Sequence, residues 1–406
     1  MKSSERFLKY VKFSTASSET SGVTPSTDGQ LVLAKALNDE LLSMGIKSTY
    51  NDLGYVYAVI PATKGCENVP AIGFIAHIDT SPEFIGEGVK PQVIENYDGN
   101  DVALGDSGRT LKVSDFPHLK NLKGKTLITT DGNTLLGGDD KAGISEIMTM
   151  AEILLDKKLP HGKICIAFTP DEEIGEGADH FDVPFFGADF GYTVDGGGVG
   201  GVEYENFNAS GATVKIKGFS VHPGSSKNTM INASLVAMEF NSMLPVCDTP
   251  RNTEGYEGFF HLTDMKGETS EATLSYIVRD HDAHNFETRN ETLRRITKLL
   301  NDKYGDGTVT LEIKQQYRNM AEMVLPHYHI VETAIKAAEN IGVTPEVYPI
   351  RGGTDGARLS FMGLPCPNLG TGAYAGHGPY EHAVVEEMDQ CVDVLLEIVK
   401  IYTERK

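Results

Sequence analysis

Three short apolar runs place the tightest limit on the fold of this chain. Residues 71–76 read Ala-Ile-Gly-Phe-Ile-Ala, and similar runs occur at Lys163–Phe168 and Phe190–Val194. Uninterrupted runs of this length are typical of strands buried on both faces of a parallel sheet. Apolar residues at helical spacing predict amphipathic helices over Leu31–Met44 and Lys141–Lys157. Buried strands that alternate with such helices indicate an α/β domain.

A different pattern starts after about Asn206. Three segments alternate apolar and polar residues, as strands with one solvated face do, at Ala212–Lys217, Thr273–Val278 and Val309–Ile313. Helical patterns follow the first two, at Met230–Met243 and Phe286–Leu300. A chain of 406 residues also exceeds the size at which one core keeps growing. We therefore expect a catalytic domain in two parts, residues 1–206 and 318–406, with a two-layer α+β domain inserted between them at 207–317.

The charge and the cysteines limit the partners and the compartment. A net charge of −21 repels phosphate backbones and anionic lipids, so neither a nucleic acid nor a membrane is expected as a partner. The five cysteines are odd in number and scattered, which favours reduced thiols in a cytoplasmic protein. The first residues contain no apolar core of a signal peptide, and no apolar run of about 18 residues predicts a membrane span.

Potential metal ligands follow each of the three apolar runs. The first run leads into His77-Ile78-Asp79, the second into Glu172-Glu173, and the third ends at Asp195. Ligands of α/β sheets gather at the carboxyl ends of the strands. An aspartate two residues after a histidine can orient its imidazole from behind, and of two adjacent glutamates one can bind metal while the other acts as a general base.

Two further segments carry ligand candidates. Asp139-Asp140 follows two glycines at the predicted start of a helix, where a single acidic residue would already serve as a cap. A loop near the C-terminus contributes His377 and His382. The glycines after Asp195 match the spelling GxGxxG, but they lead into Val-Glu-Tyr-Glu and not into a helix N-terminus, so a nucleotide site is not expected.

Taken together, this ordered set of motifs resembles the co-catalytic dizinc aminopeptidase/carboxypeptidase clan, which includes glutamate carboxypeptidase and succinyl-diaminopimelate desuccinylase. Within that clan the chain is most similar to the peptidase T family of bacterial tripeptide aminopeptidases. The stretches around His77, around Glu172-Glu173 and at Arg351–Gly356 carry this likeness. The resemblance implies a mixed, mostly parallel sheet flanked by helices, of the zinc-exopeptidase type, with the inserted α+β domain as a lid.

The resemblance also implies a role for each site residue. Two zinc ions per subunit would be bridged by Asp139. The implied metal ligands are His77, Asp139 and Asp195 for one ion, and Asp139, Glu173 and His377 for the other. His377 is preferred over His382 because a glutamate stands four residues after it. Glu172 would be the general base that activates a metal-bridging water, Asp79 would support His77, and the Asp139-Asp140 peptide bond would be cis. His222, Arg279 and Arg351 resemble substrate-binding residues.

The resemblance implies an aminopeptidase that removes the N-terminal residue from tripeptides. Another amide hydrolase of the same clan, such as a dipeptidase, carboxypeptidase or deacylase, is the alternative, because metal ligands do not encode the acyl group. A non-catalytic peptide-binding relative is a further alternative, although such a protein is expected to lose ligands or the base. A homodimer through the lid domain is also compatible with the resemblance.

Overall fold

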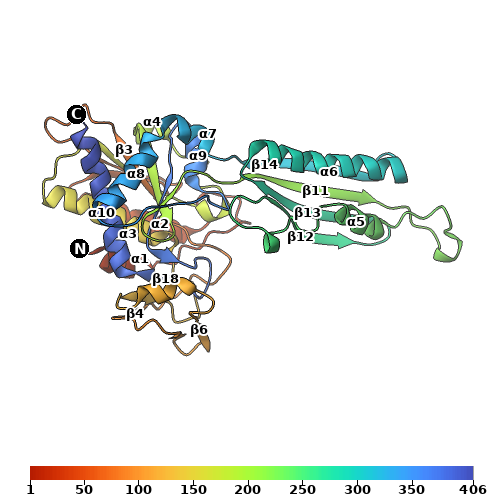
Figure 1. The fold of residues 1–406 in the computed structure, drawn as a ribbon, viewed down its shortest axis with the longest axis horizontal. Helices are drawn as coiled ribbons and strands as arrows, with labels where there is room; N and C mark the ends of the chain where they lie inside the picture. Colours follow the sequence, from red (N-terminus) through yellow and green to blue (C-terminus); the bar gives the residue numbers. More distant parts are fainter. Residues whose placement is uncertain (406) are drawn as a thin grey trace. The chain divides into compact units, whose positions relative to one another are not determined.

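The computed structural model describes residues 1–405, which fall into two compact units. Unit 1 consists of residues 1–204, 320–348 and those from 354 onward, and unit 2 consists of residues 205–319 and 349–353. Figure 1 shows the helices and strands of each unit along the chain. None of the helices in residues 1–405 combines the length and the apolar composition that a membrane crossing requires.

An eight-stranded mixed sheet forms the centre of unit 1. In spatial order its strands are β1 (Lys47–Tyr50), β2 (Val56–Ile60), β8 (Ile164–Thr169), β3 (Ile72–His77), β9 (Phe190–Gly196), β16 (Asn368–Gly370), β10 (Gly201–Glu203) and β15 (Glu346–Val347). The four strands β8, β3, β9 and β16 run parallel to one another, and the outer strands β2 and β10 pair antiparallel with β8 and β16. All six residues of β3 and of β8 are buried, which confirms the prediction of strands covered on both faces.

Helices cover both faces of this sheet. The helices of unit 1 are α1 (Ser3–Tyr10), α2 (Asp28–Ser43), α3 (Gly138–Asp156), α4 (Val183–Phe186), α7 (Ala321–Val324), α8 (His329–Asn340), α9 (Asp355–Phe361) and α10 (Val385–Glu404). Ile75 and Cys165 face one side, where they pack with Phe186 of α4 and Leu359 of α9. On the other side α3 lies so close to β9 that a Cβ on Gly143 would be 1.8 Å from the carbonyl oxygen of Val194.

Smaller strands complete unit 1. A four-stranded sheet has the order β17 (Ala373–Tyr374), β18 (His382–Val384), β7 (Leu127–Thr129) and β4 (Gln92–Ile94), and a hairpin joins β5 (Val102–Leu104) to β6 (Arg109–Leu111). Short 3₁₀ helices in the chain are η1 (Pro117–Leu122), η2 (Glu172–Ile174), η3 (Pro223–Ser225), η4 (Pro250–Asn252) and η5 (Leu325–His327). The small sheet brings the loop after β17 next to the start of α3, where a Cβ on Gly376 would lie 3.2 Å from Oδ2 of Asp139.

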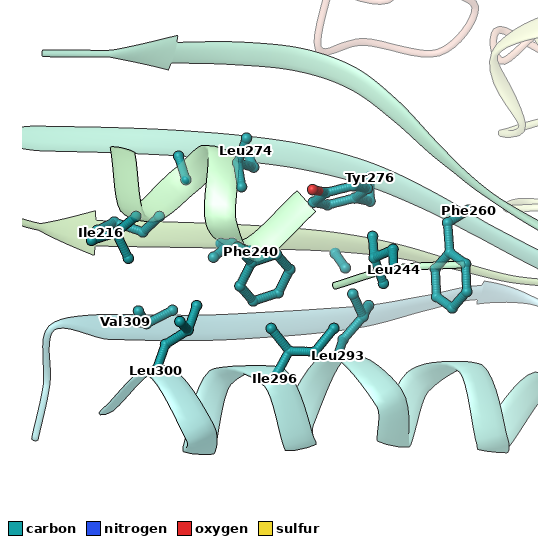
Figure 2. Packing of buried hydrophobic residues seen from close by; sticks show 14 of the residues in the cluster. Ile216, Phe240, Leu244, Phe260, Leu274, Tyr276, Leu293, Ile296, Leu300 and Val309 are labelled. Atoms are coloured by element: carbon teal, nitrogen blue, oxygen red, sulfur yellow. The ribbon is translucent and has the colours of Figure 1, made fainter. Parts of the chain in front are cut away.

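Unit 2 is a two-layer α+β structure, as predicted. Its antiparallel sheet has the order β12 (Phe259–Gly267), β13 (Glu271–Asp280), β11 (Asn208–Lys217) and β14 (Val309–Tyr317), with α5 (Ala233–Ser242) and α6 (Ala283–Tyr304) as the second layer. Leu293, Ile296 and Leu300 point from α6 toward the sheet, and Phe240 of α5 joins the same core (Figure 2). Strand β12 was not predicted, because exposed polar residues interrupt its alternation.

Glu146 of α3 is an unusual feature of the unit 1 core. Both of its carboxylate oxygens are buried without a hydrogen-bond partner among residues 1–405. Burial raises the pKa of Glu146 well above its ordinary value of 4.5, and the charge of Asp389 adds to this effect. Above pH 4.5 the unfolded chain loses this proton more readily than the folded protein, so the free energy of unfolding falls as pH rises toward the pKa of the folded state.

We therefore expect Glu146→Gln to raise the free energy of unfolding by about 1–3 kcal/mol at pH 8, because glutamine never has to bury a charge. The difference from the natural protein should shrink toward zero below pH 4.5, as measured by urea unfolding at both pH values. Asp156→Asn, at the exposed end of the same helix, is the control and should change stability by at most about 0.5 kcal/mol. An equal difference at the two pH values would contradict the role of the buried charge.

Candidate metal centre

The parallel register of β3 and β8 brings two of the motifs to one edge of the sheet. His77 is paired with Thr169 in the parallel ladder. The residues that follow β3 and those that follow β8 therefore begin side by side at the carboxyl ends of the two strands. Asp79 connects them: its Oδ1 accepts a hydrogen bond from the backbone N–H of Glu172 at 3.0 Å, and its Oδ2 accepts one from that of Glu173 at 3.1 Å. The same Oδ1 lies 3.3 Å from Nδ1 of His77. Asp79 is fully buried and positions both the imidazole and the two glutamates.

The turn that carries the two glutamates is held from a distant segment. Asp171 adopts a φ of 56°, in the left-handed region, immediately before η2. Its carboxylate accepts hydrogen bonds from the backbone N–H of Ser26 and from Nε2 of Gln30, and Gln30 accepts one from its backbone N–H. These contacts from the start of α2 fix the backbone from which Glu172 and Glu173 project.

The segment before Asp139 is organised by Glu381, a residue outside the set of predicted site residues. The buried carboxylate of Glu381 accepts hydrogen bonds from the backbone N–H groups of Leu136, Gly137 and Asp139, at 2.6, 2.7 and 3.0 Å. The peptide bond from Asp139 to Asp140 is cis, as the resemblance implied. The carboxylate of Asp140 accepts hydrogen bonds from the backbone N–H of His77 and of Gly143, so this residue has a structural role within the site.

Asp139 lies between two histidines. Its Oδ1 is 2.8 Å from Nε2 of His77, and its Oδ2 is 3.3 Å from Nε2 of His377. Nε2 of His77 is also 3.4 Å from Oδ1 of Asp195, and Nε2 of His377 is 3.0 Å from Oε2 of Glu173. The five ligands implied by the resemblance therefore form one cluster, in which each oxygen of Asp139 faces a different histidine.

His382 is placed elsewhere. It is fully buried, and its Nε2 lies 2.9 Å from Nε2 of His118, whose ring is stacked on it at an interplanar angle of 3°. Its Nδ1 lies 2.8 Å from the carbonyl oxygen of Tyr380, so both ring nitrogens have partners outside the cluster. Of the two C-terminal histidines, His377 is the one whose side chain reaches Asp139 and Glu173.

The close spacing of the carboxylates in this cluster favours the binding of a cation, as their pKa values indicate. Burial disfavours a charged His77, but the carboxylates of Asp195 and Asp139 outweigh it and hold the pKa of His77 well above its ordinary value. Burial raises the pKa of Glu173 and that of Asp195 to about 7 in each case. Burial also raises the pKa of Glu172 well above its ordinary value, against the opposing charge of His77.

The donor set fits divalent metal ions. Oε1 of Glu173 is buried and has no hydrogen-bond partner among residues 1–405, so one carboxylate oxygen is available inside the cluster. Two groups of side chains have ligand atoms within 4.8 Å of one another: His77 with Asp139 and Glu173, and His77 with Asp140 and Asp195. Imidazole and carboxylate ligands are those that zinc prefers, and a divalent ion replaces the protons that crowded carboxylates otherwise retain.

The three residues predicted to bind substrate belong to unit 2. His222 is exposed, and its Nδ1 accepts a hydrogen bond from the backbone N–H of Gly224. Arg279 is buried, donates to the carbonyl oxygens of Ser210 and Val278, and lies 5.2 Å from the ring of Tyr317.

Arg351 is engaged with a loop of its own unit. Its guanidinium group donates hydrogen bonds to the carbonyl oxygens of Gly255 and Glu257 and to Oγ1 of Thr253. It also lies 5.0 Å from the ring of Phe207. Arg351 therefore connects the segment 349–353 to the rest of unit 2.

Comparisons with known proteins identify the family of this chain. Peptidase family M20/M25/M40 matches the chain over residues 129–401. Peptidase T of Clostridium perfringens strain ATCC 13124 is 56% identical over 404 residues, which cover 99% of this chain and 99% of that protein. Peptidase T of Caldanaerobacter subterraneus subsp. tengcongensis is 52% identical over 404 residues, with coverage of 99% and 98%.

Solved structures have the same fold. The aminopeptidase PepT from Bacillus cereus matches with a TM-score of 0.79 and 22% identity, over 100% of this chain and 98% of that chain. A dinuclear metal binding peptidase of the M20 family from Bacillus subtilis matches with a TM-score of 0.67 and 15% identity, over 99% and 98% of the two chains. The chain therefore belongs to peptidase family M20/M25/M40, in which it is similar to peptidase T over its whole length, and it is a hydrolase that acts on peptide bonds.

Proposed function

We propose that this protein is a cytoplasmic dizinc aminopeptidase that removes the N-terminal residue from tripeptides. The observation that carries the proposal is the position of Asp139, whose two carboxylate oxygens face His77 and His377 at 2.8 and 3.3 Å. A carboxylate that faces two ligand groups in this way suits a pair of metal ions. The name peptidase T, given to relatives that are 52–56% identical over the whole chain, supports the choice of substrate.

Each site residue has a role in this proposal. His77, Asp139 and Asp195 would hold one zinc ion, and Asp139, Glu173 and His377 the other. The pair of ions would supply Lewis-acid chemistry toward the scissile carbonyl group. Asp79 keeps the ring of His77 in place and fixes the backbone of the two glutamates through its hydrogen bonds.

Glu172 is the proposed general base. It accepts the proton of the attacking water and returns it to the nitrogen of the leaving amine, so that the proton is conserved over the cycle. A carboxylate must bind a proton readily to do this near neutral pH, and the buried surroundings of Glu172 raise its pKa in that direction. Asp79 accepts a hydrogen bond from the backbone N–H of Glu172. This contact limits the directions in which the side chain of Glu172 can project.

The proposal also assigns roles to unit 2. The segment predicted from the sequence as an inserted domain, residues 207–317, would act as a lid and could form a homodimer contact. His222, Arg279 and Arg351 would bind the peptide. Arg279 supports this idea, because burial lowers its pKa and the described contacts of its guanidinium group are to backbone carbonyl oxygens and a tyrosine ring.

The direct test is to identify which end of a peptide is released. We expect zinc-loaded protein to release the first residue of Ala-Gly-Gly, to act slowly on the matching di- and tetrapeptides, and to leave the N-acetylated tripeptide intact, as followed by mass spectrometry. A chelator should stop the reaction, and added Zn²⁺ should restore it. Release of the C-terminal residue, or hydrolysis of the acetylated peptide, would instead favour a carboxypeptidase or a deacylase of the same family.

A further inference from the structure

His377 occupies an open loop, unlike the other histidine of the candidate metal centre. The loop joins β17 to β18, and its backbone is left-handed at Ala375 and at His377, with φ values of 55° and 66°. Glycines flank His377 on both sides. The side chain of His377 is 41% exposed, whereas that of His77 is 2% exposed. Packing therefore fixes the ring of His77 but restrains the ring of His377 much less.

The carboxylate of Glu83, a residue outside the set of predicted site residues, lies behind this ring. Nε2 of His377 faces Asp139 and Glu173, and Nδ1 lies 3.3 Å from Oε2 of Glu83. A carboxylate in that position accepts a hydrogen bond from the Nδ1–H group. The lone pair of the neutral imidazole is then on Nε2, the nitrogen that points into the cluster.

The same arrangement exists at His77. Its Nε2 faces Asp139, and its Nδ1 lies 3.0 Å from the carbonyl oxygen and 3.3 Å from Oδ1 of Asp79. A histidine that binds metal usually donates its other ring N–H to an oxygen of this kind, which fixes the tautomer and the orientation of the ring. His377 obtains the equivalent contact from a segment 294 positions away in the chain.

The backbone that carries Glu83 is held in place. The backbone N–H of Glu83 donates a hydrogen bond to Oγ of Ser81 at 3.3 Å. Two residues further on, the carbonyl oxygen of Ile85 accepts a hydrogen bond from the backbone N–H of Leu135 at 2.9 Å. Leu135 belongs to the segment that leads into Asp139. The turn with Glu83 is therefore tied to the same stretch of backbone that presents Asp139.

The direction of the Glu83 side chain is explained by this contact and not by burial. The side chain is 69% exposed, and among the residues that the structure describes no lysine or arginine forms an ion pair with it. Its charged partner is His377. Because water competes for an exposed contact, its effect on metal binding should lie at the lower end of the range for residues that support metal ligands.

We propose that Glu83 is a positioning residue of the metal centre, which holds the imidazole of His377 with Nε2 directed toward the ion that Asp139 and Glu173 share with it. The inference rests on the proposed pair of zinc ions and adds a residue to it. Glu83 acts through His377 alone, so its influence is confined to one of the two ions. The other ion, assigned to His77, Asp139 and Asp195, does not depend on Glu83.

Calorimetric titration of the metal-free protein with Zn²⁺ tests this inference. We expect Glu83→Ala to lower the affinity for one ion by about 10-fold and to leave the affinity for the other within about 2-fold of its natural value. Glu83→Gln retains an amide oxygen that can accept the Nδ1–H of His377. It should therefore restore the weakened affinity to within about 3-fold of that of the natural protein.

Two further comparisons separate positioning from a general effect. Glu87→Ala removes an exposed glutamate four residues further along the same segment, and should leave both affinities unchanged. It thereby controls for the loss of one negative charge near the cluster. In a His377→Ala background, adding Glu83→Ala should change the remaining affinity by less than about 2-fold, because the residue through which Glu83 acts is already gone.

The outcomes distinguish this inference from the proposed function. Unchanged affinities in Glu83→Ala, or an equal loss of affinity for both ions, would overturn it. So would a further loss of affinity in the His377→Ala background. A higher KM for Ala-Gly-Gly at saturating Zn²⁺, with both affinities unchanged, would mean that Glu83 contacts the substrate instead. If the natural protein binds fewer than two ions, the proposed dizinc centre fails first, whatever the variants do.

Discussion

Replacing Glu172 with glutamine is expected to lower kcat by about 10²–10⁴-fold while the protein still binds its metal ions. Glutamine has nearly the same shape as glutamate but cannot accept the proton of the attacking water. The side chain belongs to η2, whose backbone is held by Asp79 and by the contacts of Asp171, so the turn itself should be unaffected. Turnover of a tripeptide and metal content by atomic absorption are the two measurements.

Glu176→Gln is the matched control for this substitution. Glu176 is an exposed glutamate four residues further along the same turn, and its replacement should leave both kcat and metal content unchanged. Retention of full turnover by Glu172→Gln would refute its role as the base. Loss of metal together with turnover would instead assign Glu172 to the ligands.

Replacing Asp139 with alanine is expected to have a comparably large effect through a different route. The two oxygens of Asp139 face His77 and His377, so the substitution removes a contact from both ligand groups at once. Replacing a residue that hydrogen-bonds to a metal ligand typically lowers metal affinity by about 10–100-fold. Replacing a ligand itself should lower the affinity by more than this. We expect the protein to bind fewer than two metal ions and to lose turnover in the same proportion, as measured by calorimetric titration with Zn²⁺ and by a peptide assay.

Asp52→Ala provides the comparison, because Asp52 is an exposed aspartate of the same unit outside the cluster. Its removal should alter neither the metal stoichiometry nor the rate. Two metal ions bound with natural affinity in Asp139→Ala would contradict the bridging role. In that event Asp140, whose ligand atoms lie within 4.8 Å of those of His77 and Asp195, would be the better candidate.

The elements that could be predicted from the sequence are those whose signal is local. The runs that became β3, β8 and β9 are mostly apolar, and the helices α2, α3, α5 and α6 have regular periodicity, so each was identified within a few residues of its observed bounds. The strands that were missed, such as β4, β5, β6 and β12, are short or carry exposed polar residues. Their pairing is set by the neighbouring strand and not by their own pattern.

The candidate ligands were also recognisable from the sequence, because histidine and carboxylates directly after buried strands have few structural reasons to be there. The supporting residues were not. Glu381 appears in the sequence as one acidic residue in a loop, and its function becomes visible only when three backbone N–H groups of residues 136–139 converge on it. Gln30 and Ser26 likewise acquire their role only by contact with Asp171, more than a hundred positions away in the chain.

The sequence by itself determined the class of the fold, the residue types of the candidate metal centre and their order along the chain. These follow from local periodicity and from the chemistry of single side chains. Only the tertiary structure decided that His377 reaches Asp139 while His382 pairs with His118, and that Glu83 lies behind the ring of His377. Such arrangements depend on the meeting of segments far apart in the chain, and this meeting is governed by the packing of the whole unit and not by any short stretch of residues.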